Sequence, residues 1–499
     1  MISFLPVNVS SIKWLLPLLF VVGYLATVHH FEGATFEYSA YSLLALISCV
    51  VVLNQLDFFE RDCFAAWFTL ILLVMGYFVR FYWITLDPWP VERMLPWNPF
   101  RTMIANRDAL LEAFKYSTVA FACFSSAVTS LLYFSRVSTR PRSVGSGGGI
   151  QSEAGIAARW ILIGLILAMI VLDYFSYQYK IGEMGASVTD ALPFRMKGFV
   201  FYARTVSLPL ALLLCIYLAE HGGKLVVSRA GIITLLAHSV TDMLMRNSRS
   251  SLLLAFLLLG FLILAGGLRL RTGEKVLFGI LATAAFLAVP VMTEFRQIRL
   301  MQGLPHMDAL SSAIKVASED WVLQFFKGIR FVLFRMPGIE SLWCEIALDA
   351  KPLGISSLDI INSKNGIAGY LSYTIHPIRE SDNTLLAPGF VGWFFLVAGM
   401  PAIVMGALLT GAISVLGWKY LGLQQFRSGA VAQTFLLWIL FIALTEGTLD
   451  SMLLMLLAGI VTVVAMEFGL RLLAKVKRLS VNGIKHQFHD GPVTKNSGI

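Results

Sequence analysis

Apolar runs, each about as long as a membrane-spanning helix, recur along the whole chain. They lie near residues 12–29, 40–56, 64–84, 114–134, 159–175, 199–219, 230–245, 251–267, 275–293, 389–416, 429–448 and 451–473. A helix rises about 1.5 Å per residue, so roughly 20 apolar residues cross the ~30 Å hydrocarbon layer of a bilayer. The strands of a membrane β-barrel would instead show about ten residues of alternating polarity. The pattern predicts an all-α polytopic membrane protein with about 12 transmembrane helices.

The composition agrees with this class. Of the 499 residues, 57% are hydrophobic and 14% are charged, and the mean hydropathy is +0.74, whereas soluble domains are about 45–50% apolar. The first apolar run follows Lys13 and lacks a small-residue cleavage site, so we expect it to be a retained first span. Four of the five cysteines lie in or beside apolar runs, which argues against a disulfide framework.

The distribution of Lys and Arg between the apolar runs predicts the orientation of the chain. With the N-terminus in the cytoplasm, the cytoplasmic connections hold Arg61; Arg136, Arg140, Arg142 and Arg159; Lys224 and Arg229; Arg269, Arg271 and Lys275; and Lys419 and Arg427. Short cytoplasmic loops of membrane proteins are rich in Lys and Arg, so both termini are predicted to be cytoplasmic. The basic tail accounts for much of the net charge of +9. Membrane lipids are its expected partners, and nucleic acid is not, because no nucleic-acid-binding motif is present.

This topology divides the chain into four parts. Residues 1–293 hold transmembrane helices 1–9, and residues 294–388 form one large outer loop that contains helices of its own. Residues 389–474 hold transmembrane helices 10–12, and residues 475–499 form a basic cytoplasmic tail. An outer loop of this length is more often functional than idle.

Several arginines lie on the outer side, against the charge bias. They are Arg246 and Arg249 before the run 251–267, Arg296 and Arg299 after the ninth run, and Arg379 in the outer loop. An arginine at the membrane edge must snorkel to the headgroups, pair with a carboxylate or face a wet cavity. Guanidinium groups match phosphate oxygens bidentately, and the start of a helix offers unpaired N–H groups to an anion. Two interpretations therefore stand for Arg246 and Arg249: snorkelling, or a grip on a lipid phosphate or pyrophosphate, with Arg249 the stronger candidate for the grip.

The same region resembles a known family. An "SR" pair starts a strongly apolar helix, a large outer loop follows, and then comes "HPIRESDNTLLAPGFVGWFFLVAGMPAIVMGALLTG" (376–411). This order resembles the superfamily of O-antigen polymerases (Wzy-type) and O-antigen ligases, over residues 240–415 by motif and over the whole chain by topology. The resemblance implies a GT-C-like glycosyltransferase of the bacterial inner membrane that needs no metal and no cofactor. Its activity would be polymerisation of undecaprenyl-pyrophosphate-linked oligosaccharide repeat units into surface polysaccharide at the periplasmic face.

The resemblance also assigns candidate residues. Arg249 matches the arginine of the family's "SR" pair and Asn383 the asparagine of its "HN" motif, whereas Asp382 stands where the histidine would be. Glycosyl transfer needs cations on the leaving pyrophosphate and a base for the attacking hydroxyl. We therefore predict Asp382 and His376 as catalytic residues. The predicted substrate-binding residues are Arg249, Arg246, Arg296, Arg299, Arg379 and Asn383; Glu380, His306 and Glu294 are alternative bases on the same side.

Other functions remain alternatives. Glu32 and Glu37, in the first outer loop, are compatible with a GT-C transferase that uses a polyprenyl-phosphate sugar; an O-antigen ligase and a flippase or other transporter are further candidates. The span centres are nearly bare of charge, which favours an enzyme over a transporter, and the missing histidine favours polymerase over ligase. The expected partners are a lipid-linked oligosaccharide and membrane lipids, and a separate chain-length regulator is left open. No residues have the spacing of metal ligands.

Overall fold

The computed structural model is mainly helical over the residues that it describes. These are residues 13–56, 63–87, 106–137, 151–182, 196–246, 249–302, 304–319, 322, 326, 338–361, 367, 370–371, 388–422, 428–446 and 449–489. No strand occurs in these ranges. The prediction of an all-α protein is therefore confirmed.

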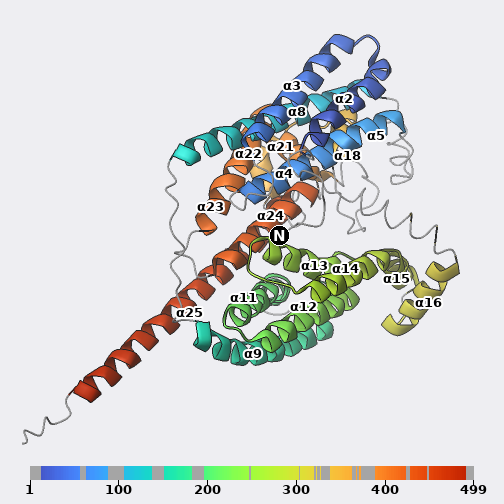
Figure 1. The fold of residues 1–499 in the computed structure, drawn as a ribbon. Helices are drawn as coiled ribbons and strands as arrows, with labels where there is room; N and C mark the ends of the chain where they lie inside the picture. The colour runs from blue at the N-terminus through green and yellow to red at the C-terminus, as the bar shows by residue number, and fades with distance from the viewer. Residues whose placement is uncertain are drawn as a thin grey trace, which may run out of the picture.

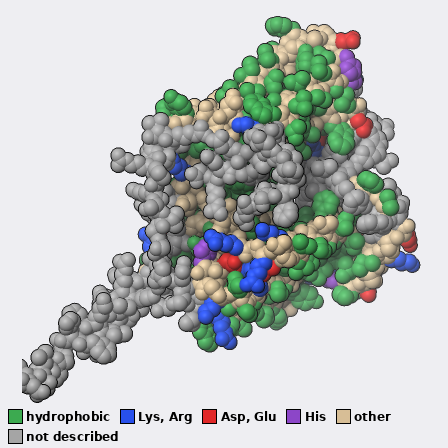
Figure 2. All heavy atoms as spheres, in the orientation of Figure 1, with side chains coloured by type: hydrophobic (Ala, Val, Ile, Leu, Met, Phe, Trp, Pro, Cys, Tyr) green, Lys and Arg blue, Asp and Glu red, His purple; other side chains and the backbone are tan. Residues whose placement is uncertain are grey.

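Apolar helices of membrane-spanning length dominate the described part of the chain. Nine of its helical stretches are long and apolar enough to cross a bilayer, and the shorter apolar helices are Leu15–Phe31, Leu253–Leu264, Gly389–Ala398 and Gly429–Thr445. Each predicted apolar run overlaps at least one of these helices. On the face shown in Figure 2, hydrophobic side chains cover much of the coloured surface. These features support a multi-pass membrane protein.

The helices form two groups (Figure 1). The first group contains α2 (Leu15–Thr27), η1 (Val28–Phe31), α3 (Thr35–Gln55), α4 (Phe64–Leu73), η3 (Val74–Val79), α5 (Arg80–Leu86), α8 (Arg107–Val137), α18 (Ile339–Ala347), η6 (Gly354–Ser356), α19 (Ser357–Ile361), α21 (Gly389–Ala398), α22 (Met400–Ala412), η7 (Ile413–Gly417) and α23 (Trp418–Leu421). The second group contains α9 (Gln151–Gln178), α10 (Met196–Tyr202), η5 (Ala203–Ser207), α11 (Leu208–His221), α12 (Leu225–Arg246), α13 (Arg249–Leu264), α14 (Thr272–Leu287), α15 (Val289–Gln302) and α16 (His306–Glu319). Helix α24 (Gly429–Glu446) contacts both groups, and α25 (Leu449–His489) extends beyond them.

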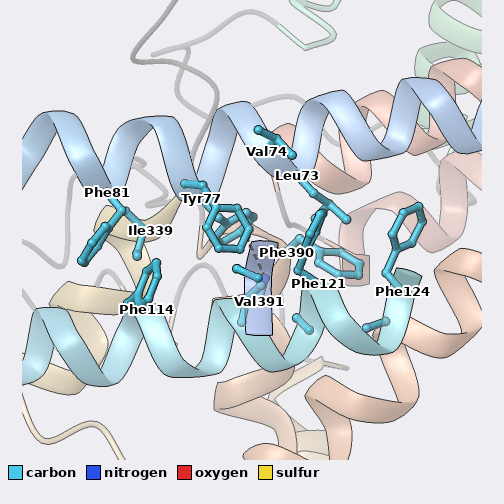
Figure 3. Packing of buried hydrophobic residues seen from close by; sticks show 14 of the residues in the cluster. Leu73, Val74, Tyr77, Phe81, Phe114, Phe121, Phe124, Ile339, Phe390 and Val391 are labelled. Atoms are coloured by element: carbon cyan, nitrogen blue, oxygen red, sulfur yellow. Dashed lines mark hydrogen bonds between the residues drawn. The ribbon is translucent and has the colours of Figure 1, made fainter. Parts of the chain in front are cut away.

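Aromatic packing holds the first group together. Phe81 of α5 stacks on Phe114 of α8 with ring centroids 4.2 Å apart, and Phe78 meets Phe121 one layer further along at 5.1 Å. Figure 3 shows the two helices facing each other across Phe81, Phe114 and Phe121, with Phe390 of α21 beside them. Such ring pairs contribute about 0.5–1.5 kcal/mol each beyond the area that they bury.

Polar contacts at the helix ends fix the direction of neighbouring helices. In the second group, Arg229 of α12 forms ion pairs with Glu220 of α11 at 2.6 Å and with Glu274 of α14 at 2.7 Å. These contacts bring the end of α11 and the starts of α12 and α14 to one end of the group. We call it the Arg229 end, defined by Arg229, Glu220 and Glu274. The opposite end, where α12 stops at Arg246, is the Arg246 end.

The segment 389–416 is not the single span that its hydropathy predicts. The chain forms the 10-residue helix α21, turns at Gly399 and returns as α22, with the Phe394 ring against Gly406. Gly399 has φ +65° and ψ −147°, and Pro401 follows in the first turn of α22. Such backbone angles are essentially restricted to glycine. The division therefore has a local cause, and α21, at about 15 Å, covers only half of a bilayer core.

Part of the large loop packs into the first helix group. Helix α18 lies against α8 and α21, and the Trp343 indole donates to the backbone carbonyl of Asn106 at 3.1 Å. Glu340 of α18 forms an ion pair with Arg80, which follows the π-helical segment η3. The described part of the loop thus contributes to the helix bundle.

The turn at Gly399 generates a test of the fold. Alanine at this position must adopt a strained backbone conformation, so we expect Gly399→Ala to lower the free energy of unfolding by about 2 kcal/mol. Thermal unfolding in detergent should show a lower Tm. The matched control is Gly164→Ala, on α9, where an added Cβ meets no atom within 4 Å and alanine favours the helix. Equal Tm values for Gly399→Ala and the wild type would contradict this account.

Candidate functional site

The sequence-predicted residues divide into those that the structure describes and those that it does not. His376, Arg379, Asp382 and Asn383 lie outside the described residues. Helix α13 begins at Arg249, whose side chain is likewise outside the described part. Arg246, Arg296 and Arg299 are described, and they lie on α12 and α15.

Arg246 is held by the protein rather than extended along its surface. Its Nη1 lies 3.1 Å from Asp242 Oδ2, and its guanidinium carbon lies 4.8 Å from the centre of the Phe201 ring. Gly182, with φ +75°, lies against the Arg246 side chain and the Phe201 ring, and a Cβ there would come within 3.2 Å of Arg246 Nε. These contacts favour pairing over snorkelling for Arg246.

Arg204 is a buried cation that the sequence analysis missed. It lies on the π-helical segment η5 with 1% of its surface exposed. Its Nε donates to Asp173 Oδ1 at 2.7 Å, and its Nη1 lies 3.2 Å from Asp242 Oδ1. Asp173, Arg204 and Asp242 all lie within candidate spans. None of the three stands at the centre of its span, so they do not contradict the expectation that the span centres are nearly bare of charge. They can be buried inside spans because they are paired and so need no contact with water.

Asp242 joins the end of α12 to the start of α13. The Ser251 hydroxyl, in the first turn of α13, donates to Asp242 Oδ2 at 2.5 Å. The Ser239 hydroxyl of α12 donates to the backbone carbonyl of Ser251. One carboxylate thus contacts Arg204, Arg246 and Ser251, so it fixes the relative positions of two arginines and a helix start.

A small cavity lies beside this carboxylate, and His238 lines it. Its polar lining residues include His238, Ser239, Asp242 and Ser251, and its apolar ones include Leu254. His238 Nε2 lies 3.1 Å from the Arg204 carbonyl oxygen. Because a carbonyl only accepts, Nε2 is the donor in this contact. Within the described residues, the buried His238 Nδ1 has no hydrogen-bond partner, which is unusual for a buried polar atom.

The charged side chains described at this end balance one another. Two aspartates, Asp173 and Asp242, are matched by two arginines, Arg204 and Arg246. The start of α13 is positively polarised and the end of α12 negatively polarised, so these two helix ends offset each other. Asp242 is four residues from the end of α12, a depth of about 6 Å along the helix. An anion at the Arg246 end would therefore meet the Arg246 guanidinium group and a helix start, close to the helix ends.

Arg296 and Arg299 lie on a helix that packs beside this end. Met292 and Phe295 of α15 share a hydrophobic cluster with Met243 of α12. Arg299 Nη1 donates to the backbone carbonyl of Leu304 at 2.6 Å, so this arginine closes the turn between α15 and α16. The structure thus brings α15 to the end of α12 and gives Arg299 a structural contact there.

A second buried polar cluster lies in the first helix group and was also missed. Glu345 of α18 is fully buried, its oxygens lie against Gly392, and neither has a hydrogen-bond partner among the described residues. The nearby Tyr77 hydroxyl accepts a hydrogen bond from the Val391 N–H at 2.9 Å. Burial raises the pKa of Glu345 well above its ordinary value. Burial thus favours the neutral form of this carboxyl group. The described part of the cluster lacks the excess of cations that would bind an anion.

The cluster of polar groups around Asp242 is a better candidate for a ligand site than the cluster around Glu345. Among the described residues, no three His, Cys, Asp or Glu side chains are grouped as a metal site. Glu37, one of the acidic residues of the first outer loop, pairs with Lys115 at 2.6 Å and so links α3 to α8. The sequence carried one signal for the first cluster, because His238, Asp242 and Arg246 recur every four residues on one face of α12.

The buried Glu345 predicts a pH dependence of stability. The unfolded chain releases this proton near the ordinary pKa of 4.5, whereas the folded state keeps it to higher pH. The folded state then binds more protons, so stability falls as the pH rises above about 4.5. We expect Glu345→Gln, which stays neutral, to remove this decline. Thermal unfolding between about pH 5 and pH 8 measures it.

The control for this prediction is Asp308→Asn, which removes an exposed carboxylate on α16. It should leave the pH dependence of the wild type unchanged. If the Tm of Glu345→Gln fell with pH as steeply as that of the wild type, the buried neutral carboxyl would be excluded.

Comparison with known proteins adds no family to this description. No protein-family model, no curated protein and no solved structure matches the chain. The function is therefore argued from the geometry of the site and from the resemblance of its motifs.

Proposed function

We propose that the protein is a polysaccharide polymerase of the Wzy type, which joins undecaprenyl-pyrophosphate-linked oligosaccharide repeat units at the outer face of the bacterial inner membrane. One observation carries the proposal: Asp242 holds Arg246 and the first turn of α13, which begins at Arg249, side by side at the Arg246 end. The guanidinium group of Arg246 beside a helix start is suited to a pyrophosphate, and Arg249, the first residue of that helix, is the proposed second cation.

The proposed reaction needs the protein mainly to position the two substrates and to stabilise the charge of the leaving group. A sugar hydroxyl of one repeat unit attacks the anomeric carbon of the growing glycan, and the bond from that carbon to the pyrophosphate oxygen breaks. The electron pair leaves with the pyrophosphate, which Arg249 and Arg246 stabilise. The hydroxyl proton passes to a base, for which Asp382 and His376 remain the proposed residues.

The predicted orientation of the chain favours a reaction at the outer face. The connections of the Arg229 end are those predicted to be cytoplasmic from their Lys and Arg content. The Arg246 end is then the periplasmic one, and both termini are cytoplasmic. The exposed hydrophobic side chains of α12, such as Ile233 and Val240, would lie near the polyprenyl chain of a substrate in the bilayer.

A second candidate function is transport of the lipid-linked oligosaccharide. It is favoured by the buried set Asp173, Arg204 and Asp242, because charged residues inside spans often lie on substrate or ion pathways. The set lies near one end of the helices rather than at several depths, which supports the enzyme over the carrier. The two functions differ in their product, since only the polymerase makes new glycosidic bonds.

The proposal predicts the effect of removing Arg249. We expect Arg249→Ala to slow elongation of lipid-linked glycan about 100-fold, because a cation on the leaving group is lost. Arg249→Lys should retain part of the rate, since it keeps the charge but not the bidentate geometry. The measurement is the length of glycan made by purified protein from lipid-pyrophosphate oligosaccharide in nanodiscs.

The matched control for this assay is Arg269→Ala, an exposed arginine at the Arg229 end. It should elongate like the wild type. Wild-type rates in Arg249→Ala would rule out the phosphate grip. Transbilayer movement of the substrate without new glycosidic bonds would favour the carrier.

The orientation can be tested without substrate. A cysteine at Ser311, exposed on α16, should react with a membrane-impermeant maleimide added to the periplasmic side. A cysteine at Lys275, exposed near the Arg229 end, should react only after the membrane is opened. The reverse labelling pattern would place the Arg246 end in the cytoplasm and exclude the proposed reaction.

A further inference from the structure

The carboxylate of Asp242 is shared by three partners from three helical segments. Oδ2 accepts from the Ser251 hydroxyl at 2.5 Å and lies 3.1 Å from Arg246 Nη1. Oδ1 lies 3.2 Å from Arg204 Nη1. Only 4% of the residue is exposed, so water does not replace these contacts.

Each of these contacts has a different consequence. The contact with Arg204 neutralises a buried cation, which in turn holds Asp173 of α9. The contact with Arg246 fixes one guanidinium beside the Phe201 ring. The contact with Ser251 fixes the first turn of α13, and with it the backbone position of Arg249.

We infer that Asp242 is a positioning residue of the proposed polymerase, one that sets the geometry of its pyrophosphate grip and limits the positive charge there. The inference rests on the proposed function. Asp242 does not touch the substrate; it acts through Arg246 and through the start of α13. Its negative charge lowers the affinity of the site for pyrophosphate, so that the lipid pyrophosphate product is not bound too tightly.

This double role predicts opposite changes in two kinetic constants. Asp242→Asn keeps the shape of the side chain but removes its charge, and its amide nitrogen cannot accept from an arginine. The net charge of the site then rises by one unit. This change strengthens ground-state binding of the pyrophosphate, so KM should fall about threefold. The arginines lose their fixed positions, so kcat should fall about tenfold or more.

Ser251→Ala separates position from charge. It removes the hydrogen bond between α13 and Asp242 but leaves every charge in place. We expect kcat to fall about threefold while KM stays the same. A merely structural defect would lower the amount of folded protein without lowering KM.

The chain offers a matched control at the other end of α12. Glu220 accepts from the Ser228 hydroxyl at 3.0 Å and from Arg229 Nη1 at 2.6 Å, which is the same chemistry as that of Asp242. Glu220→Gln therefore removes a comparable carboxylate away from the site, and both kinetic constants should stay within about twofold of the wild type.

The experiment measures KM and kcat for elongation in nanodiscs and, separately, the affinity of each variant for undecaprenyl pyrophosphate. Asp242→Asn should bind this lipid about threefold more tightly than the wild type. Unchanged kcat and affinity in Asp242→Asn would overturn the inference, even where the wild type elongates glycan and the proposed function stands. A wild type that elongates nothing would overturn the proposed function, and the affinities would still test the charge at the site. If Asp242→Asn fails to fold, a normal kcat in folded Ser251→Ala overturns the positioning role.

Discussion

The second helix group depends on the pairing of charges that are buried away from water. Arg204 is almost fully buried and is compensated by Asp173 on α9 and Asp242 on α12. Breaking a buried ion pair by removing one partner typically costs about 3–5 kcal/mol, because the other charge stays behind. Three helical segments must therefore keep the register that lets these groups meet, and Ser251 extends the constraint to α13. The candidate site exists because this register is fixed.

The two ends of α12 show how similar chemistry leads to different electrostatics. At the Arg229 end, one arginine meets two carboxylates, Glu220 and Glu274. At the Arg246 end, two arginines meet two aspartates. The first ion-pair group therefore has a net negative charge, whereas the second is balanced. An anion would be repelled by the first group and not by the second, which is compatible with the location of the proposed pyrophosphate grip.

The sequence predicted the helical class because apolar runs of membrane length carry a strong signal. It could also have predicted the turn at Gly399, since Gly399 and Pro401 stand together inside the run 389–416. It could not place Arg204, because the residues that compensate it, Asp173 and Asp242, are 31 and 38 positions away along the chain. It left two interpretations open for Arg246 for a similar reason. Phe201 and Gly182, which lie against this arginine, are also far from it along the chain.

The two buried arginines share a backbone feature that no sequence pattern announces. Arg80 directly follows the π-helical segment η3, and Arg204 lies within the π-helical segment η5. A π turn widens the helix by one residue, which changes the direction of the side chains around it and is common at functional sites. Both arginines are buried and form ion pairs with carboxylates, so their charges are used within the fold. Arg246 stands instead at the end of a helix, where one carboxylate and the Phe201 ring hold it. The fold thus separates arginines beside or within π turns, which are buried among helices, from an arginine at a helix end, where the proposed ligand would meet it.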